Sequence, residues 1–212
     1  MESYLRKCFR EPIDEIFTAS KYLDEAVNYH LIGDFQKAEQ LIIKADLPLI
    51  REWTESLWGK NSPYINFKKI LNSPPVFEKK DRIENRMPTQ ELKNKLIERD
   101  GYNCVFCGIP LIRVEVRNHI KKLYPNSLKW ERTNINQHAA FQAMWLQYDH
   151  LLPHSRGGNN DLENLVITCA PCNFARMQFT LTEVGIENPL LNKRAISNWD
   201  GLERILKLPT IY

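Results

Sequence analysis

Two Cys-x-x-Cys pairs stand on either side of an adjacent aspartate and histidine, and this arrangement constrains the fold more than any other feature of the chain. In chain order the motifs are Cys104-Val-Phe-Cys107, Asp149-His150 and Cys169-Ala-Pro-Cys172. Each short turn can present two thiolates to one ion, so the two pairs offer the four sulfur ligands of a tetrahedral zinc site. A four-cysteine site is closed to substrate, and we therefore expect a structural zinc.

A redox role is the alternative reading of a Cys-x-x-Cys pair, but two pairs in one small domain favour metal binding. The 61 residues between Cys107 and Cys169 can be filled by helices. Cys8 is outside both pairs, and we expect an ordinary thiol there.

Length and composition indicate an ordinary globular protein. The 212 residues suffice for one large domain or two small ones, and 43% are hydrophobic and 26% charged. No apolar run approaches the length of a membrane span, and the first residues lack an apolar signal core. We expect a cytoplasmic protein with no membrane partner.

The small positive charge is concentrated around the motifs. Residues 104–178 contain eight Lys and Arg against five Asp and Glu, which equals the net charge of +3, whereas the other segments balance to zero. A basic motif-bearing segment is the expected sign for a polyanionic partner.

The rest of the chain is predicted to be mostly helical, and three regions are expected. Residues 1–88 form a helical accessory region with a Pro-rich linker, 89–180 form the motif-bearing domain, and 181–212 form a helical tail that packs on it. Helical periodicity covers residues 13–57, with a break at Gly33-Asp34. Thr89 is expected to cap a helix that ends at Asp100-Gly101, and another helix is expected near residues 197–206.

The stretch between the two cysteine pairs predicts a helical insertion followed by strand, loop, strand and helix. Arg113, Arg117 and Lys121 are spaced four apart and would form a basic stripe on one helix, while Asn134–Leu146 would form a second helix. Strands are expected at residues 145–152 and 165–168, and a final helix at residues 172–178, with Pro171 near its start.

The residues at the end of the first strand suit phosphodiester hydrolysis. Neutral His150 can take a proton from water, because the ordinary pKa of histidine lies near working pH. The Asp149 carboxylate and the Asn173 amide offer oxygen ligands to Mg²⁺ or Mn²⁺. Adjacent strand residues point to opposite faces, so a bend or bulge would be needed for Asp149 and His150 to share a site.

Residues Cys104 to about Met177 resemble an HNH endonuclease domain of the ββα-metal class. The resemblance rests on Cys-x-x-Cys, Asp-His-x-x-Pro-x-Ser-x-Gly-Gly and Asn-Leu-x-x-x-Cys-x-x-Cys-Asn, and it covers about a third of the chain. It implies an α+β, mostly helical chain in which a helical region precedes a zinc-bound ββα nuclease domain. It also implies cleavage of DNA through one divalent metal, which leaves a 5′-phosphate.

The resemblance assigns roles to individual residues. His150 becomes the general base, Asp149 and Asn173 the ligands of the catalytic metal in an H-N-N version of the motif, and Asn164 the support of the loop around the base. Contacts to DNA phosphates are expected from a further set of basic residues, which are Arg156, Arg176, Arg113, Arg117, Lys121 and His154.

Three functions remain open at this point. The first is a metal-dependent DNA endonuclease, for example in restriction or phage defence. The second is a catalytically silent, zinc-stabilised module that binds nucleic acid or protein. The third is a nuclease that is inert alone and acts through a protein partner or a homo-oligomer formed by the N-terminal helices.

Overall fold

The computed structural model describes residues 5–58, 61–192 and 197–207, and over these ranges the fold is α+β and mostly helical, as expected. The helices and strands in chain order are α1 (Asp14–Leu31), α2 (Phe35–Lys44), α3 (Pro48–Ser56), α4 (Gln90–Asp100), α5 (Val114–Leu123), α6 (Ala139–Ala143), β1 (Leu146–His150), β2 (Leu165–Cys169), α7 (Ala170–Arg176) and α8 (Leu181–Val184). Short 3₁₀ helices lie at Lys79–Asp81, Asn134–Asn136, His154–Arg156, Pro189–Leu191 and Glu203–Lys207. None of the described helices is long and apolar enough to cross a membrane.

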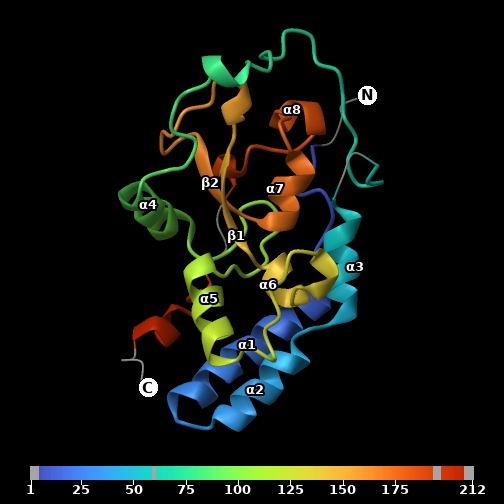
Figure 1. Cartoon of the computed structure of the whole chain (residues 1–212). Coiled ribbons are helices and arrows are strands. Elements are labelled where there is room, and N and C mark those ends of the chain that lie inside the picture. Colours follow the sequence, from blue (N-terminus) through green and yellow to red (C-terminus); the bar gives the residue numbers. More distant parts are fainter. Residues whose placement is uncertain (1–4, 59–60, 193–196, 208–212) are drawn as a thin grey trace.

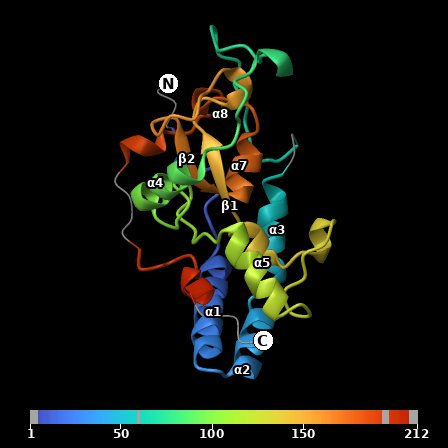
Figure 2. The same ribbon diagram turned by 60° about the vertical axis from the view of Figure 1, so that its left-hand side comes forward.

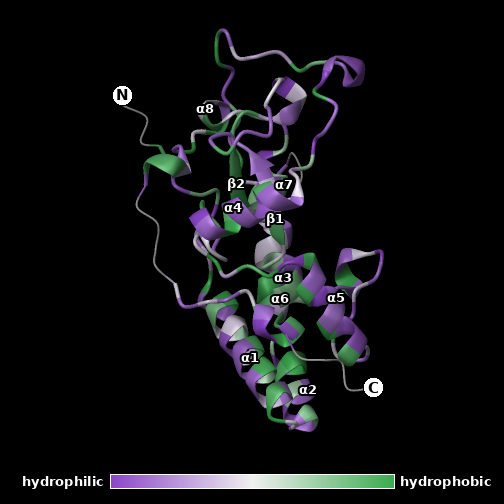
Figure 3. Ribbon diagram, turned by 90° about the vertical axis from the view of Figure 1, so that its left-hand side faces the viewer, coloured by the Kyte–Doolittle hydropathy of each residue, from purple (hydrophilic) through white to green (hydrophobic). Residues whose placement is uncertain are grey.

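The N-terminal helices form the end of the molecule that lies away from the sheet (Figure 1). The buried positions of α1 recur at helical spacing from Ile16 to Val27, as the sequence predicts. Helix α2 starts where the Asp34 side chain accepts a hydrogen bond from the Lys37 N–H at 3.0 Å. Apolar residues of α1 and α2 are concentrated where the two helices meet (Figure 3). Phe35, the first residue of α2, has 57% of its surface exposed.

One hydrophobic core runs through both ends of the molecule. Buried side chains of α1, α2 and α3 belong to the same cluster as those of α6, the sheet and α7. Figure 2 shows α3 lying between the α1–α2 hairpin and the end of the molecule that carries the sheet. The three-part division near residues 88 and 180 therefore has no break in the core to mark it, and it stays a prediction.

Between the two cysteine pairs the chain forms α5 and the short helix α6. The helix expected over residues 134–146 is confined to Ala139–Ala143. A 3₁₀ turn precedes it, and the Arg51 guanidinium donates to the Gln137 carbonyl at 2.7 Å and to the Asn134 carbonyl. These contacts hold the chain before Ala139 in a non-helical path.

Residues 74–87, part of the expected linker, lie along the loop that joins β1 to β2 and are called the covering segment below. The Phe77 N–H donates to the Ser155 carbonyl at 2.8 Å, and the His154 Nε2 lies 2.8 Å from the Ile83 carbonyl. Figure 1 shows this segment at the end of the molecule near α7 and α8. The Pro-rich stretch is thus packed against the β1–β2 loop (residues 151–164), a long-range contact that its turn-like sequence does not reveal.

The tail lacks the helix expected near residues 197–206. A turn precedes the 3₁₀ helix Glu203–Lys207, and both Gly201 and Leu202 have positive φ angles, of 68° and 63°. A Cβ on Gly201 would lie 2.4 Å from the Tyr102 ring, so this close approach requires glycine and interrupts a helix here.

His138, the residue before α6, contacts α2, and we expect its titration to lower the stability of the protein at acidic pH. His138 is fully buried, its Nε2 lies 2.9 Å from the Ile42 carbonyl, and burial lowers its pKa below the ordinary value of 6.5. The unfolded chain therefore binds the proton more readily, and the contribution of the neutral ring is present above pH 6.5 and lost as the pH falls below it. Melting temperatures measured across this pH range should fall more steeply for the wild type than for His138→Gln, whose amide can still donate to Ile42. Equal slopes would contradict this assignment.

Candidate active site and metal centre

The four paired cysteines converge on one point, as the spacing predicts. Their sulfur atoms all lie within 4.8 Å of one another, and the Cys107 and Cys169 Sγ atoms are 3.7 Å apart. Zinc–sulfur bonds of about 2.3 Å in a tetrahedron place the sulfurs roughly 3.8 Å apart. The cluster therefore fits a closed, four-sulfur zinc site.

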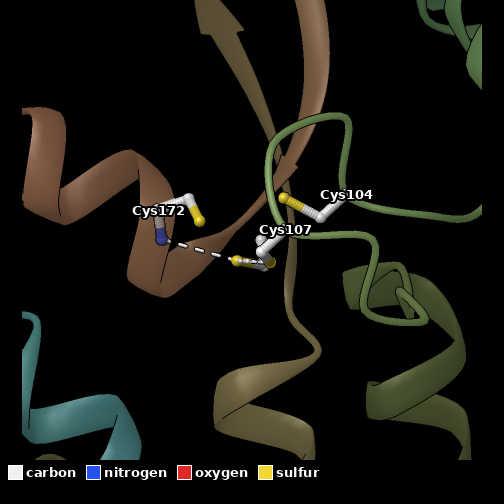
Figure 4. A group of neighbouring side chains, drawn as sticks. Cys104, Cys107 and Cys172 are labelled. Atoms are coloured by element: carbon white, nitrogen blue, oxygen red, sulfur yellow. Dashed lines mark hydrogen bonds between the residues drawn. The ribbon is translucent and has the colours of Figure 1, made fainter. Parts of the chain in front are cut away.

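Local backbone features build this centre from two distant parts of the chain. The first pair lies on a turn closed by the Cys104 N–H and the Ile109 carbonyl at 2.9 Å, with Gly108 at a φ of 78°. The second pair starts α7, where the Cys169 sulfur accepts the Cys172 N–H at 3.4 Å. Figure 4 shows Cys104 and Cys107 on the first turn facing Cys172 on α7. A bound metal would thus fix the first turn of α7.

Asp149 and His150 share a site without a bulge in the strand. Strands β1 and β2 pair antiparallel in an unbroken register, with Asp149 opposite Val166 and His150 opposite Leu165. His150 is the last residue of β1, and the Asp149 carboxylate accepts its N–H at 2.8 Å. Both side chains are buried and both line the same cavity. Because β1 ends at His150, the two side chains reach one cavity without a bulge within the strand.

The His150 imidazole is held neutral and hydrogen-bonded on one side. Burial lowers the pKa of His150 below the ordinary value of 6.5 and outweighs the opposing effects of Asn160 and Asp149. Its Nε2 lies 2.9 Å from the Asn160 Oδ1. Nδ1 has no protein partner among the described residues and is not sealed from solvent. A neutral ring with an open nitrogen can accept a proton from water.

Asp149 is paired with a buried arginine, which changes the expected role of Arg176. The Arg176 Nε donates to Asp149 Oδ2 at 2.8 Å, and its Nη2 contacts Oδ1 of the same carboxylate. Only 1% of the Arg176 surface is exposed, and its Nη1 also donates to the Phe179 carbonyl at 2.9 Å. Arg176 therefore orients Asp149 from inside the fold, and its expected contact with a DNA phosphate stays a prediction.

The donors around the cavity fit a hard divalent cation. Asp149 Oδ1 accepts both Arg176 and the His150 N–H, whereas Oδ2 accepts only Arg176 among the described residues and keeps a lone pair. Asn173, on the first turns of α7, lines the same cavity of about 320 Å³, and its amide has no hydrogen bond among the residues described. One carboxylate oxygen and one amide oxygen, completed by water, are a donor set that Mg²⁺ accepts.

Asn164 joins the two limbs of the β1–β2 loop. Its Oδ1 accepts the Leu152 N–H at 2.8 Å, and its Nδ2 donates to the Asn159 carbonyl at 2.9 Å. Gly158 makes this approach feasible, because a Cβ there would lie 1.8 Å from the Leu152 carbonyl oxygen. Asn164 thus bridges the start and the end of the β1–β2 loop, and its loop-supporting role in the site stays a prediction.

The other basic candidates lie in contacts within the chain. Arg156 donates to the Gln178 carbonyl at 2.7 Å and forms an ion pair with Glu183 at 3.1 Å, with 8% of its surface exposed. His154 contacts the Ile83 carbonyl through Nε2, and it also lines the cavity of the site. Arg156 thus ties the loop to Gln178 and to α8, and its expected phosphate contact stays a prediction.

The basic residues of the stripe expected on the insertion also make contacts within the chain. Arg113 forms a two-pronged ion pair with Glu203 at 2.6 and 2.7 Å. Arg117 is buried over the Trp130 ring at 3.7 Å, and Lys121 donates to the Trp130 carbonyl at 3.0 Å. Arg113 therefore links the insertion to the tail, whereas Arg117 and Lys121 pack within the insertion, and the three side chains do not form an exposed stripe.

Two arginines and an asparagine of this site are not evident from the sequence. Arg82 and Arg86 line the cavity from the covering segment, more than 60 positions before Asp149. Arg86 is exposed and has no hydrogen bond or ion pair within the described ranges. Asn160 reaches His150 from the β1–β2 loop. Only the fold brings these three side chains to the site, and no local motif marks them.

Part of the chain that contains Asp149, His150 and Asn173 matches a model of a known protein family. Residues 136–177 match the family model described as HNH endonuclease. The matched range contains α6, both strands, the β1–β2 loop and α7, and it leaves the first cysteine pair outside. No curated protein and no solved structure matches the chain.

Proposed function

We propose that this chain, which carries an HNH endonuclease domain, is a metal-dependent DNA endonuclease with a structural Zn²⁺ and a catalytic Mg²⁺ or Mn²⁺. The observation that carries the proposal is the common cavity of His150, Asp149 and Asn173 at the junction of β1 and α7. A base and two oxygen donors for a cation are the groups that water-mediated phosphodiester cleavage requires.

Each side chain has a distinct task in the proposed reaction. His150 takes a proton from a water molecule, whose oxygen then bonds to phosphorus while the bond to the 3′ oxygen breaks. The leaving oxygen takes a proton from solvent, so that the products are a 5′-phosphate and a 3′-hydroxyl. Asp149 and Asn173 would hold the divalent ion, which when bound neutralises the charge that develops on the phosphate and the leaving oxygen.

The covering segment supplies the cations that would hold the scissile phosphate. Arg86 is exposed at the cavity and its guanidinium is uncommitted among the described residues, whereas Arg82 is steered by its Nε–H bond to the Phe77 carbonyl at 3.0 Å. Guanidinium groups bind phosphate oxygens through paired hydrogen bonds. These residues replace the buried Arg156 and Arg176 as candidate phosphate ligands.

Arg86→Ala should lower kcat/KM for DNA cleavage while leaving the fold intact. Loss of a charge-assisted hydrogen bond costs about 1.5–3 kcal/mol, which corresponds to a decrease of roughly 10–100-fold in kcat/KM. The slope of the logarithm of the DNA-binding constant against the logarithm of salt concentration should also decrease by about one, because one fewer counterion is released. Lys80→Ala is the matched control, because Lys80 lies in the same segment with 75% of its side chain exposed and does not line the cavity. Equal kcat/KM values for the two variants would remove Arg86 from the site.

The function itself is tested with the purified, zinc-loaded protein. Supercoiled, linear, methylated and single-stranded DNA, and RNA, are incubated with Mg²⁺ or Mn²⁺ and with EDTA. We expect nicking or cutting of DNA that requires the divalent ion and leaves 5′-phosphate ends. Persistent inactivity on every substrate and metal would contradict an autonomous nuclease.

The buried pair between Asp149 and Arg176 favours a second candidate function. Arg176 donates hydrogen bonds to both oxygens of the Asp149 carboxylate that would bind the metal, as it would in a catalytically silent site. The chain would then be a zinc-stabilised module that binds nucleic acid or protein. Salt-sensitive DNA binding without cleavage under any divalent ion would favour this candidate. Cleavage that appears only with a partner docked on the N-terminal helices, or in a homo-oligomer, would favour a dependent nuclease in restriction or phage defence.

A further inference from the structure

We infer that Asn160 is a positioning residue that fixes His150 in the tautomer protonated on Nε2, and that the covering segment fixes Asn160. The contact between His150 Nε2 and Asn160 Oδ1 is 2.9 Å long. The inference deepens the proposed function, because it specifies which nitrogen of the proposed base accepts the proton.

The orientation of the Asn160 amide follows from its second partner. Its other terminal atom lies 2.6 Å from the Asn85 carbonyl oxygen, in the covering segment. A carbonyl oxygen only accepts hydrogen bonds, so the amide nitrogen must face Asn85 and the amide oxygen must face His150. An amide oxygen also only accepts, and the His150 Nε2 must therefore carry the hydrogen.

The remaining ring nitrogen is then suitably placed for the reaction. With the proton on Nε2, a neutral imidazole carries its lone pair on Nδ1. His150 lines the cavity that contains Asp149 and Asn173, whereas Asn160 is not part of the cavity wall. Nδ1 has no protein partner among the described residues, and His150 keeps 5% of its surface exposed. The opposite tautomer would present an N–H group to the attacking water. A ring nitrogen that already carries a hydrogen cannot accept the proton of the water.

The covering segment is held where Asn160 needs it. It contacts the β1–β2 loop through the Phe77 N–H and Ser155 carbonyl at 2.8 Å, and through Ile83 and His154, also at 2.8 Å. Asn85 follows Ile83 by two residues, so these contacts fix the carbonyl that orients Asn160. The segment expected as a linker thus determines which ring nitrogen of the base carries the hydrogen. Asn85 and His150 are 65 positions apart in the sequence.

The test reads the tautomer directly in the zinc-loaded full-length protein. Long-range ¹H–¹⁵N correlation spectra, recorded where the ring is neutral, distinguish the protonated ring nitrogen, and His150→Gln assigns the His150 signals. We expect Nε2–H in the wild type and in Asn160→Asp, which keeps the acceptor. Asn160→Leu should yield a mixture of tautomers or Nδ1–H, and kcat should fall about 10–100-fold with little change in KM.

Asn159→Ala is the control for a general disturbance of the loop. Asn159 is the neighbouring residue, and its side chain pairs with Asp161 and not with His150. It should keep the wild-type tautomer and rate. An Nδ1–H signal in the wild type, or an unchanged tautomer in Asn160→Leu, would overturn the inference. The spectra decide this even if the protein cleaves no DNA, so failure of the proposed function is seen separately.

Discussion

His150→Ala should lower the rate of DNA cleavage by about 10²–10⁴-fold, the usual contribution of a positioned general base. The variant loses the buried, neutral imidazole at the end of β1 while Asp149 and Asn173 remain. Among the residues that the structure describes, the His150 side chain bonds only to Asn160, so its removal should leave zinc content and melting temperature close to those of the wild type. Initial rates of plasmid nicking at saturating Mg²⁺ provide the measurement.

His154→Ala is the matched control for this prediction. The two imidazole rings are 5.7 Å apart, and His154 also borders the cavity, but its Nε2 is bonded to the covering segment. We expect a loss in this variant that is much smaller than in His150→Ala. The reverse order, with His154→Ala inactive and His150→Ala active, would show that the base has been assigned to the wrong histidine.

Loss of the structural metal should unfold the catalytic end of the molecule. A structural zinc site contributes an apparent binding free energy of about 10–16 kcal/mol, which equals or exceeds the total stability of about 5–15 kcal/mol typical of a domain. The four sulfurs are contributed by the first turn and by the start of α7, so their separation also releases Asn173. Cys172→Ser should therefore lose zinc, lower the melting temperature sharply and abolish cleavage.

Zinc content per chain and thermal unfolding provide the measurements for this second prediction. Cys8→Ser is the control, because Cys8 is also buried but its thiol bonds to Glu11 and is not one of the four clustered sulfurs. It should keep one zinc ion and the wild-type rate. A Cys172→Ser protein that retains zinc and full cleavage would contradict a structural role for the cluster.

The sequence predicts those parts of the site that depend on local patterns and spacing. Thr89 caps α4 through the Leu92 N–H at 3.3 Å, and α4 ends at Asp100, as its sequence indicates. The order strand, loop, strand and helix follows from β-branched runs and from Pro171 at the start of α7. The clustering of the cysteines follows from the paired spacing alone. Such features need little information about distant segments.

The rest of the site could not be predicted because it depends on contacts across the fold. Arg176 has the charge and helical position of a phosphate ligand, yet the fold directs it onto Asp149. Arg113 has a place in a basic stripe, yet Glu203 of the tail neutralises it. The covering segment has the prolines of a linker, but its main chain pairs with the β1–β2 loop. Charge and periodicity do not identify which partner a side chain meets.

The assignment of Asn173 and Asp149 to the catalytic metal is tested most directly by cleavage rates of Asn173→Ala across an Mg²⁺ titration. Gln178→Ala is the matched control, because it removes an amide from the wall of the same cavity. A metal stabilises such a transition state by several kcal/mol, so Asn173→Ala should cut roughly 10²–10³-fold more slowly or need far more Mg²⁺, while Gln178→Ala cuts nearly as the wild type does. Wild-type rates and Mg²⁺ dependence in Asn173→Ala would contradict a catalytic metal held by Asp149 and Asn173.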